Sequence, residues 1–508
     1  MKQLIYIIGC VALFSTGMLT SCKKDFDTLN TDPNSTQNAL PQQLLAPALV
    51  NTVSANLSRN RSFNNELMQI TVDMNDAEGK VFRYDFRSSW SDYLYTTWYQ
   101  NITNYKELYK TASDSLTRNR SFQGIALICQ SWVFSLLTDT YGDLPYSQAI
   151  LGKDSAIYHP IFDRQKDIYI DIFKQLDSAN SLLSKNDAIA AGSDPVYNGD
   201  VSKWRKFGNS LYLRLLLRVS GKAEVADMVK AKIKDIVETS AAQYPIMTST
   251  AESAILRWTG VGPYTSPLLG VREQDFRAPA IGSFFIDHLA AWNDPRIDIP
   301  TYGANGYNRW AIIPYSGMFV GVPSGYSPGT GVPKKTYFNS YVAGNTAPSL
   351  MNDPMTGMIM NYPELCFILA ECAAKGYISG SAATYYNNGV LYSINQWVPK
   401  FVQANLDPYL TAADMQWNDA VSLDDKMEKI HIQKYYAMFL TDLQQWFEYR
   451  RTGHPVLPKG AGLKNDGVMP ARMPYPVFVQ STNPSNYKDA VNKQGPDLIS
   501  TQVWWQKP

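Results

Sequence analysis

One stretch of the chain matches a catalytic pattern in form: Gly325-Tyr326-Ser327-Pro328-Gly329 reads G-x-S-x-G. In a nucleophile elbow, the residue after the serine donates its backbone N–H to the oxyanion of the reaction intermediate. Here that residue is Pro328, and proline has no backbone N–H. We therefore do not expect a serine hydrolase site at Ser327.

The histidines and glycines give no metal-binding or nucleotide-binding pattern. His159, His288, His431 and His454 are isolated from one another and show no metal-ligand spacing. Neither G-x-x-x-x-G-K-[ST] nor a strand followed by G-x-G-x-x-G occurs. We expect neither a metal nor an organic cofactor. The sequence does not decide whether two carboxylates form a catalytic pair for glycoside cleavage, because any two acids of the chain could meet in the fold.

Two closely spaced acid pairs are assigned to structure. Asp139 and Asp143 have no base, metal-ligand histidine or third carboxylate nearby in sequence, so we expect them to make capping and turn hydrogen bonds. Glu364 and Glu371 are predicted to be a first-turn partner of the helix dipole and a surface or interhelical polar contact. We expect no catalytic residue, and the protein is predicted not to be an enzyme.

Composition and charge argue against a nucleic-acid partner and show an excess of aromatic residues. The chain has 508 residues, a formal net charge of +1 and no long run of lysine or arginine, so nucleic acid is not an expected partner. It contains 32 tyrosines, 12 tryptophans and 20 phenylalanines. Many of these rings fall in segments too broken by glycine and proline to be helix core, and aromatic rings outside helices need another use.

The N-terminus has the pattern of a processing signal. A charged start and an apolar run precede Leu19-Thr20-Ser21-Cys22, which resembles a bacterial lipobox. We expect residues 1–21 to be a signal peptide, Cys22 to be the lipidated residue and 22–38 to be a lipidated tether. The remaining Cys129, Cys366 and Cys372 lie on apolar helical stretches and are predicted to be buried free thiols.

The rest of the chain is predicted to be mostly α-helical, with the helices in pairs. Apolar residues recur at helical spacing in four successive pairs of segments. Recurrent pairs favour tetratricopeptide-like packing, although no exact 34-residue period survives. The predicted pairs are 91–112 with 122–139, 163–184 with 201–220, 361–375 with 381–397, and 411–421 with 426–451.

A loop-rich insertion interrupts this scaffold at about 250–350. Glycines and prolines are closely spaced there and alternate with tryptophan, tyrosine and phenylalanine, and only 279–292 has a helical pattern. A long irregular segment inside a compact protein is more often a functional surface than filler. We expect residues 39–508 to be one domain in which this segment binds the ligand.

The last predicted helix carries the most specific pattern of the chain. In KIHIQKYYAMFLTDLQQWFEYRRTGHP, from Lys429 to Pro455, apolar residues recur at helical spacing, and Gly453 and Pro455 supply a left-handed cap and a stop. The segment closely resembles the pattern K-I-x-x-Q-K-[WY]-x-A-x-F…W-x-E-x-R-R-T-G-x-P of the SusD/RagB-type nutrient-binding outer-membrane lipoproteins. Three other segments are similar to this family's signatures: 137–149 (LTDTYGDLPYSQA), 197–218 and 362–390. The LNTDPN start at 29–34 matches one of its subgroups.

This resemblance implies a function. It implies a cell-surface lipoprotein of the outer membrane that captures a nutrient oligomer and passes it to a SusC-type TonB-dependent transporter. An oligosaccharide is the first expectation for the ligand, and an oligopeptide is the alternative within the family. A surface-anchored hydrolase and a purely structural tetratricopeptide-like scaffold are the rival hypotheses.

Ligand contacts are predicted among rings and cations on irregular segments. Flat rings offer apolar faces to sugar C–H groups or peptide side chains, and neighbouring polar groups fix the orientation. The candidates are Arg83, Trp90, Trp258, Tyr302, Tyr307, Trp310 and Tyr326.

Overall fold

A computed structural model of the chain describes residues 39–74, 80–327, 330, 334 and 336–507. The predicted signal peptide, Cys22 and the lipidated tether lie outside these residues. From Pro41 onward the described chain forms one compact unit.

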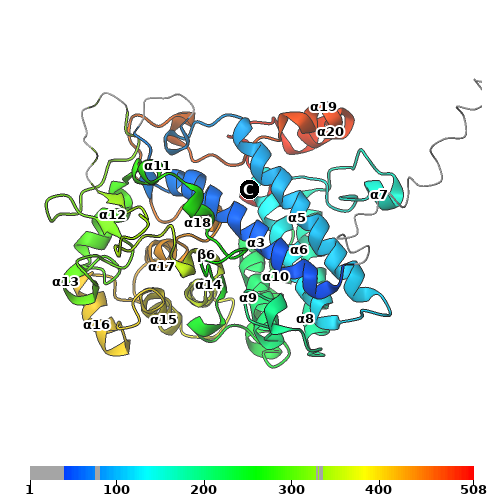
Figure 1. Cartoon of the computed structure of the whole chain (residues 1–508), viewed down its shortest axis with the longest axis horizontal. Helices are drawn as coiled ribbons and strands as arrows, with labels where there is room; N and C mark the ends of the chain where they lie inside the picture. The colour runs from blue at the N-terminus through cyan, green and yellow to red at the C-terminus, as the bar shows by residue number, and fades with distance from the viewer. Residues whose placement is uncertain (1–38, 75–79, 328–329, 331–333, 335, 508) are drawn as a thin grey trace, which may run out of the picture. The chain divides into compact units, whose positions relative to one another are not determined.

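The first half of this unit is a row of long helices (Figure 1). The longer helices pack in succession, α3 with α5, α5 with α6, α6 with α8, α8 with α9 and α9 with α10, and the short α4 and α7 are not part of this series. The first two predicted helix pairs, α5 with α6 and α8 with α9, are therefore confirmed. The helices are α3 (Pro41–Arg59), α4 (Asn65–Leu67), α5 (Ser89–Ser113), α6 (Arg120–Tyr141), α7 (Gly152–Ser155), α8 (Gln165–Leu183), α9 (Val201–Val219) and α10 (Ala226–Lys234).

Side-chain caps explain where several of these helices begin and end. The Asn119 side chain accepts a hydrogen bond from the backbone of Phe122 at the start of α6, and Asp200 caps α9 in the same way. Helix α6 ends at Gly142, whose φ of +84° is a conformation that favours glycine.

Helix α6 is the most buried helix of the row. It is long and apolar enough to cross a membrane, but 94% of its apolar window is buried within the described part of the fold. It therefore acts as a core helix, with α5 on one side and α8 on the other.

The second half of the unit holds a further group of helices. Helices α14 and α15 form the predicted hairpin, and α17 packs against both (Figure 1). The prediction of a helix at 411–421 is wrong, because α16 ends at Ala412 and turns follow it. The helices are α14 (Tyr362–Ala374), α15 (Ala382–Asn395), α16 (Gln403–Ala412), α17 (Leu423–Ala437), α18 (Gln444–Thr452), α19 (Val477–Thr482) and α20 (Pro484–Gln494).

The prediction of one continuous helix over 426–451 is also wrong. The helix is interrupted between α17 and α18, where Leu440 has a φ of +71° and Asp442 a φ of +30°. Distant side chains hold this break: Asn60 donates to the carbonyl oxygen of Asp442 at 2.7 Å, and Trp132 Nε1 donates to its carboxylate at 3.4 Å. Gly453, with a φ of +75°, caps α18 as predicted.

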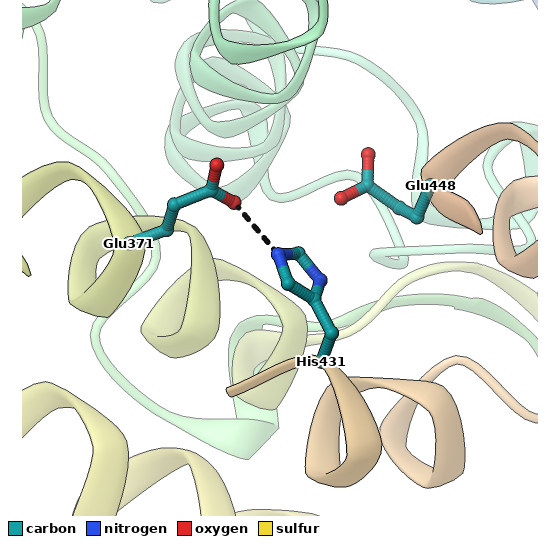
Figure 2. A group of neighbouring side chains, drawn as sticks. All are labelled: Glu371, His431 and Glu448. Atoms are coloured by element: carbon teal, nitrogen blue, oxygen red, sulfur yellow. Dashed lines mark ion pairs between the residues drawn. The ribbon is translucent and has the colours of Figure 1, made fainter. Parts of the chain in front are cut away.

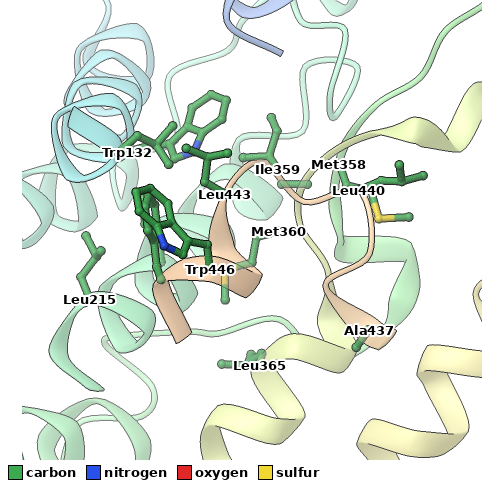
Figure 3. Close-up of a cluster of buried hydrophobic side chains, with 14 of the residues drawn as sticks. Trp132, Leu215, Met358, Ile359, Met360, Leu365, Ala437, Leu440, Leu443 and Trp446 are labelled. Carbon is green, nitrogen blue, oxygen red and sulfur yellow. The ribbon is translucent and has the colours of Figure 1, made fainter. Parts of the chain in front are cut away.

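The break brings apolar side chains into the core. Figure 3 shows Leu440 and Leu443 from the break packed with Trp132 of α6 and with residues of β6 and α14. Trp446 of α18 is fully buried there, and its Nε1 donates to the carbonyl of Pro470 at 2.8 Å. Cys129, Cys366 and Cys372 are buried free thiols, as predicted.

The segment 250–350 is irregular, as expected. Its helices are short. The named strands of this segment form antiparallel two-stranded ladders with each other or with a neighbouring strand outside it: β3 with β1, β2 with β6, and β4 with β5. The predicted helix at 279–292 is present as α12. The helices are α11 (Glu273–Arg277), α12 (Ser283–Ala291) and α13 (Ile299–Tyr302), and the strands are β1 (Thr71–Val72), β2 (Ala254–Leu256), β3 (Ala280–Ile281), β4 (Ile312–Ile313), β5 (Tyr337–Phe338) and β6 (Gly357–Met360).

Candidate functional site

Two of the predicted contact residues lie inside the core. Trp258 is 2% exposed and Trp310 is fully buried. The Trp310 ring stacks on Phe285 with 5.7 Å between centroids, and the guanidinium of Arg296 lies 4.9 Å from its centroid. Neither tryptophan offers an exposed ring face, so both shape the loops around them and do not reach a ligand in this structure.

Arg83 and Tyr326 are brought to one corner of the loop-rich region. Arg83 Nε donates to the carbonyl of Gly462 at 3.0 Å. The backbone before Tyr326 contacts the same loop, because a Cβ placed on Gly325 would lie 2.7 Å from the backbone of Gly460. Tyr326 packs against a small buried apolar cluster, and together these residues make what we call the Arg83–Tyr326 corner; the cluster is Val72, Phe82, Ala280 and Val322.

The other three predicted contacts lie apart from this corner along the chain. Trp90, at the start of α5, is half-buried and has the guanidinium of Arg59 4.8 Å from its ring centroid. Tyr302 ends α13 and packs edge-on against Phe401, at 6.3 Å. Tyr307 lies in the turn that follows α13. The rings of Tyr302 and Tyr307 stay partly exposed.

A cleft of about 560 Å³ opens beside α11 in the loop-rich segment. Its volume lies within the range of sites that hold small molecules. Its walls combine an aromatic ring, aliphatic side chains and both signs of charge. We call it the α11 cleft, and it is lined by Leu269, Val271, Arg272, Glu273, Gln274, Arg277, Tyr341, Ala343 and Met351.

Polar groups of the α11 cleft are available to a ligand. In the described part of the chain, the side chains of Glu273, Gln274 and Arg277 make no hydrogen bond, whereas Arg272 pairs with Asp275 at 2.6 Å. A guanidinium and an amide beside a tyrosine ring can orient a polyhydroxylated ligand. The ring packs against the C–H groups of the ligand, and the polar groups form hydrogen bonds with its hydroxyls.

The α11 cleft and the Arg83–Tyr326 corner adjoin the same ladder. Arg277 ends α11 three residues before Ala280, which pairs with Val72 in the β1–β3 ladder and belongs to the corner cluster. Arg61 holds α11 in place, donating to the carbonyl of Asp275 at 2.7 Å. The two features are therefore linked through the β1–β3 ladder.

A protonated carboxyl underlies the corner. Glu66 accepts a hydrogen bond from the backbone N–H of Phe82 at 3.3 Å. Burial, together with the nearby charge of Asp73, raises the pKa of Glu66 to about 8. At neutral pH this group is mostly neutral and can donate as well as accept a hydrogen bond.

One buried cluster has the composition of a metal site. Figure 2 shows Glu371 of α14, His431 of α17 and Glu448 of α18 pointing toward one another, and their ligand atoms all lie within 4.8 Å. The Nε2 of His431 lies 3.3 Å from Glu371. Burial lowers the pKa of His431, so its ring is neutral.

The two carboxylates of this cluster already form ion pairs with cationic side chains of the protein. Arg451 donates to both oxygens of Glu371, at 2.7 and 2.6 Å, and to Glu448 at 2.7 Å. Lys434 adds a contact of 2.7 Å to Glu448, and Lys375 one of 2.6 Å to Glu371. Burial opposes ionisation, but the charge of Arg451, the other nearby cations and the hydrogen bonds together outweigh it and hold the pKa of both glutamates well below the usual value. A divalent cation would have to displace these groups, so we assign the cluster to structure and call it the Arg451 network.

The Asp139–Asp143 pair has structural roles. Asp143 accepts from the backbone N–H of Gln165 at 2.9 Å and so caps α8, as predicted. Asp139 does not cap a helix, because it is buried and accepts from Tyr169 Oη at 2.6 Å and Trp505 Nε1 at 2.8 Å. The pair is therefore split between a helix cap and an interhelical contact.

The structure confirms the roles expected for Glu364. This residue lies in the first turn of α14 and is buried, and it accepts two interhelical hydrogen bonds from Arg214 of α9, at 2.6 and 2.7 Å. The sequence spacing could not reveal that α9 supplies this cation. In the G-x-S-x-G stretch, Pro328 and Gly329 lie outside the described residues.

A third feature is an apolar cleft of about 360 Å³ between α5 and α19. Ile150 and Phe478 at its rim are 37% and 42% exposed. Few polar groups face it, so it suits an apolar surface better than a sugar. Its lining is Tyr95, Thr96, Tyr99, Gln100, Thr103, Pro145, Ala149, Ile150, Pro160 and Phe478.

The sequence reasoning did not single out Arg277, Gln274 or Tyr341. The one signal in the sequence that applies to them is the loop-rich composition of the segment 250–350, in which all three residues lie. The chain brings Tyr341 to α11 across more than sixty residues, and no local pattern encodes that approach.

Comparison with known proteins identifies relatives. The SusD-like family model described as "starch-binding associating with outer membrane" matches residues 33–476. No curated protein matches the sequence significantly.

Solved structures show the same fold. A SusD homologue from Bacteroides uniformis is 24% identical, with a TM-score of 0.74 over 92% of this chain and 99% of that one. A SusD homologue from Bacteroides fragilis is 23% identical, with a TM-score of 0.74 over 92% and 100% of the chains. A chitin-binding SusD homologue from Flavobacterium johnsoniae is 20% identical, with a TM-score of 0.74 over 92% and 98%.

Proposed function

Because the chain belongs to the SusD-like family of starch-binding proteins that associate with the outer membrane, we propose that it binds a nutrient oligosaccharide at the cell surface. It then delivers the sugar to a SusC-type TonB-dependent transporter. The lipid on Cys22 anchors the protein to the outer membrane, and residues 22–38 form the tether.

The α11 cleft is the observation that supports a sugar ligand most directly. It joins the Tyr341 ring to three polar side chains, Glu273, Gln274 and Arg277, that make no hydrogen bond within the described chain. Glu273 and Gln274 are exposed and Arg277 is partly exposed, so all three can exchange water for the hydroxyls of a ligand without breaking a hydrogen bond of their side chains to the described chain. Arg83, Tyr302, Tyr307 and Tyr326 are proposed as outer contacts for a longer chain of sugar units.

Chitin oligosaccharides are the first ligands to test. One structural relative is a chitin-binding SusD homologue, and its fold extends over 92% of this chain. Starch oligosaccharides come next, from the description of the family. Oligopeptides are the alternative, since the Glu273 and Arg277 charges also suit peptide backbones and termini.

Binding without catalysis fits the acids of the scaffold. Asp139, Glu364, Glu371 and Glu448 are all held in hydrogen bonds or ion pairs within the core. A general acid and a general base must reach the scissile bond, and buried, paired carboxylates cannot. A surface-anchored hydrolase is the rival that product analysis distinguishes.

The test is calorimetric titration of the mature chain with chitin, starch and peptide oligomers. We expect one oligosaccharide class to bind without release of products, and Tyr341→Ala to weaken it by about 2 kcal/mol, a loss of about 30-fold in affinity. Tyr158→Ala is the matched control, because Tyr158 is 73% exposed and does not line the α11 cleft. Cleavage of the oligomers, or equal binding by the two variants, would refute the proposal.

A further inference from the structure

A second pocket, of about 200 Å³, lies among the long helices and not in the loop-rich segment. It is enclosed by α5, α6, α8 and the loop that follows α6. Its size suits a molecule much smaller than an oligosaccharide. We call it the helix pocket, and it is lined by Lys106, Gln130, Ser131, Phe134, Tyr146, Ser147, Asp171 and Gln175.

A buried hydroxyl in the helix pocket has no partner. Ser131 is 2% exposed, and its Oγ forms no hydrogen bond with the described residues. One turn later on the same helix, the Oγ of Ser135 donates to the carbonyl of Trp132 at 2.6 Å. An unpaired buried hydroxyl costs about 1–3 kcal/mol, so an occupant of the pocket that pairs with Ser131 would recover that cost.

The charges of the helix pocket balance. Lys106 and Asp171 are its charged lining residues, and they carry opposite signs. Lys106 Nζ donates to the carbonyl of Ala149 at 2.7 Å, which leaves two of its three N–H groups. Tyr146 Oη and Gln175 Nε2 donate to one oxygen of Asp171, at 2.6 and 3.2 Å, and the other oxygen accepts no hydrogen bond from the described chain. The pocket therefore favours a neutral ligand with both donors and acceptors.

Two aromatic rings add apolar surface to these polar groups. Phe134 and Tyr146 line the helix pocket, and their ring centroids are 4.6 Å apart in an edge-to-face arrangement. A ligand with an apolar face and hydroxyls around its edge would use rings, amides and charged groups at once.

We propose that the helix pocket binds one neutral sugar ring, as a free monosaccharide or as the end unit of a longer glycan. Ser131 and Asp171 pair with its hydroxyls, and Phe134 and Tyr146 pack against its C–H groups. This site is separate from the α11 cleft and does not depend on the function proposed for that cleft. A free amino acid is the competing occupant, because its two charges also sum to zero.

The experiment titrates glucose, N-acetylglucosamine and glutamine separately into the mature chain, followed by calorimetry. We expect one of the sugars to bind at one site. Ser131→Ala should weaken it about 3-fold to 10-fold and Asp171→Asn at least about 10-fold, as expected for a neutral and a charged hydrogen bond. Ser135→Ala is the matched control on the same helix and should bind as the parent does. Tyr341→Ala should also leave monosaccharide binding unchanged, which separates this site from the α11 cleft.

A crystal of the unaltered protein soaked in the same sugar gives a second readout that needs no variant. Density for a sugar ring between Phe134 and Asp171 would support the proposal. Three outcomes would overturn it: only water in the helix pocket, equal sugar affinity for Ser131→Ala and the parent, or binding of glutamine without binding of either sugar.

Discussion

Replacing Arg451 with alanine tests whether the Arg451 network stabilises the scaffold. The change removes two hydrogen bonds to Glu371, at 2.7 and 2.6 Å, and two to Glu448, at 2.7 and 3.4 Å. The side chains of Glu371 and Glu448 are only 0% and 5% exposed. Two carboxylates would therefore be left in the core without their principal counterion.

The expected cost follows from that burial. Removing one partner of a buried ion pair destabilises a protein by about 3–5 kcal/mol, because the remaining charge stays desolvated. The unfolding entropy of a domain of this length is about 1 kcal/mol per degree, from about 2.1 cal/mol/K per residue. We expect Arg451→Ala to lower the Tm by about 3–5 °C and the free energy of unfolding by about 3–5 kcal/mol.

The measurement is thermal and urea denaturation of the variant and the parent. Lys493→Ala is the matched control, because Lys493 and Asp489 pair at 2.7 Å with both side chains more than half exposed. Exposed pairs contribute about 0–1 kcal/mol. A loss for Arg451→Ala no larger than that of the control would refute the reasoning.

The same network predicts how stability depends on acid. The pKa of Glu371 and of Glu448 lies well below the usual value of 4.5 in the folded state. The unfolded carboxyls therefore bind protons first, so the contribution of the network is present above pH 4.5 and is lost as the pH falls below it. Arg451→Ala should flatten this dependence between pH 5 and pH 3.

Further outcomes are expected elsewhere in the fold. The pKa of Glu66 is raised by burial to about 8 from 4.5, so the parent should lose stability as the pH rises between these values, and Glu66→Gln should melt higher than the parent at pH 8 but not at pH 4. The hydrogen bond that His454 donates to Glu428 raises the pKa of His454 above 6.5, so its contribution is present below pH 6.5 and lost at higher pH. His454→Gln should lower the Tm at pH 6 and leave it unchanged at pH 9. Gly142→Ala should lower the Tm more than Gly344→Ala, because both have a positive φ, of +84° and +80°, but only the first Cβ would clash with a side chain, that of Gln494, which accepts a hydrogen bond from the backbone N–H of Asp143.

The helical scaffold was largely predictable, because its helices are long and amphipathic. Periodicity located α5, α6, α8 and α9 within a few residues. It failed between α17 and α18, where apolar spacing continues through the break. Contacts of Asp442 with Asn60 and Trp132, more than three hundred residues away, decide the backbone there. Local patterns do not contain such contacts.

The candidate site was predictable as a region and not as a set of residues. The composition of 250–350 indicated a functional surface, and the α11 cleft lies within it or at its edge. Residue type alone could not separate Trp310, which is fully buried, from Tyr302, which is partly exposed. Burial depends on which segments meet in the fold. The sequence therefore placed Trp258 and Trp310 among the predicted ligand contacts, although the fold uses both rings for packing.

The most direct test of the account is the titration of the mature chain with chitin and starch oligosaccharides, on the parent, Tyr341→Ala and Arg277→Ala. We expect the parent to bind one of these glycans intact, and each variant to lose about 10-fold or more in affinity. Binding of neither glycan by the parent, or undiminished binding by both variants, would contradict the claim that the α11 cleft captures a nutrient oligosaccharide.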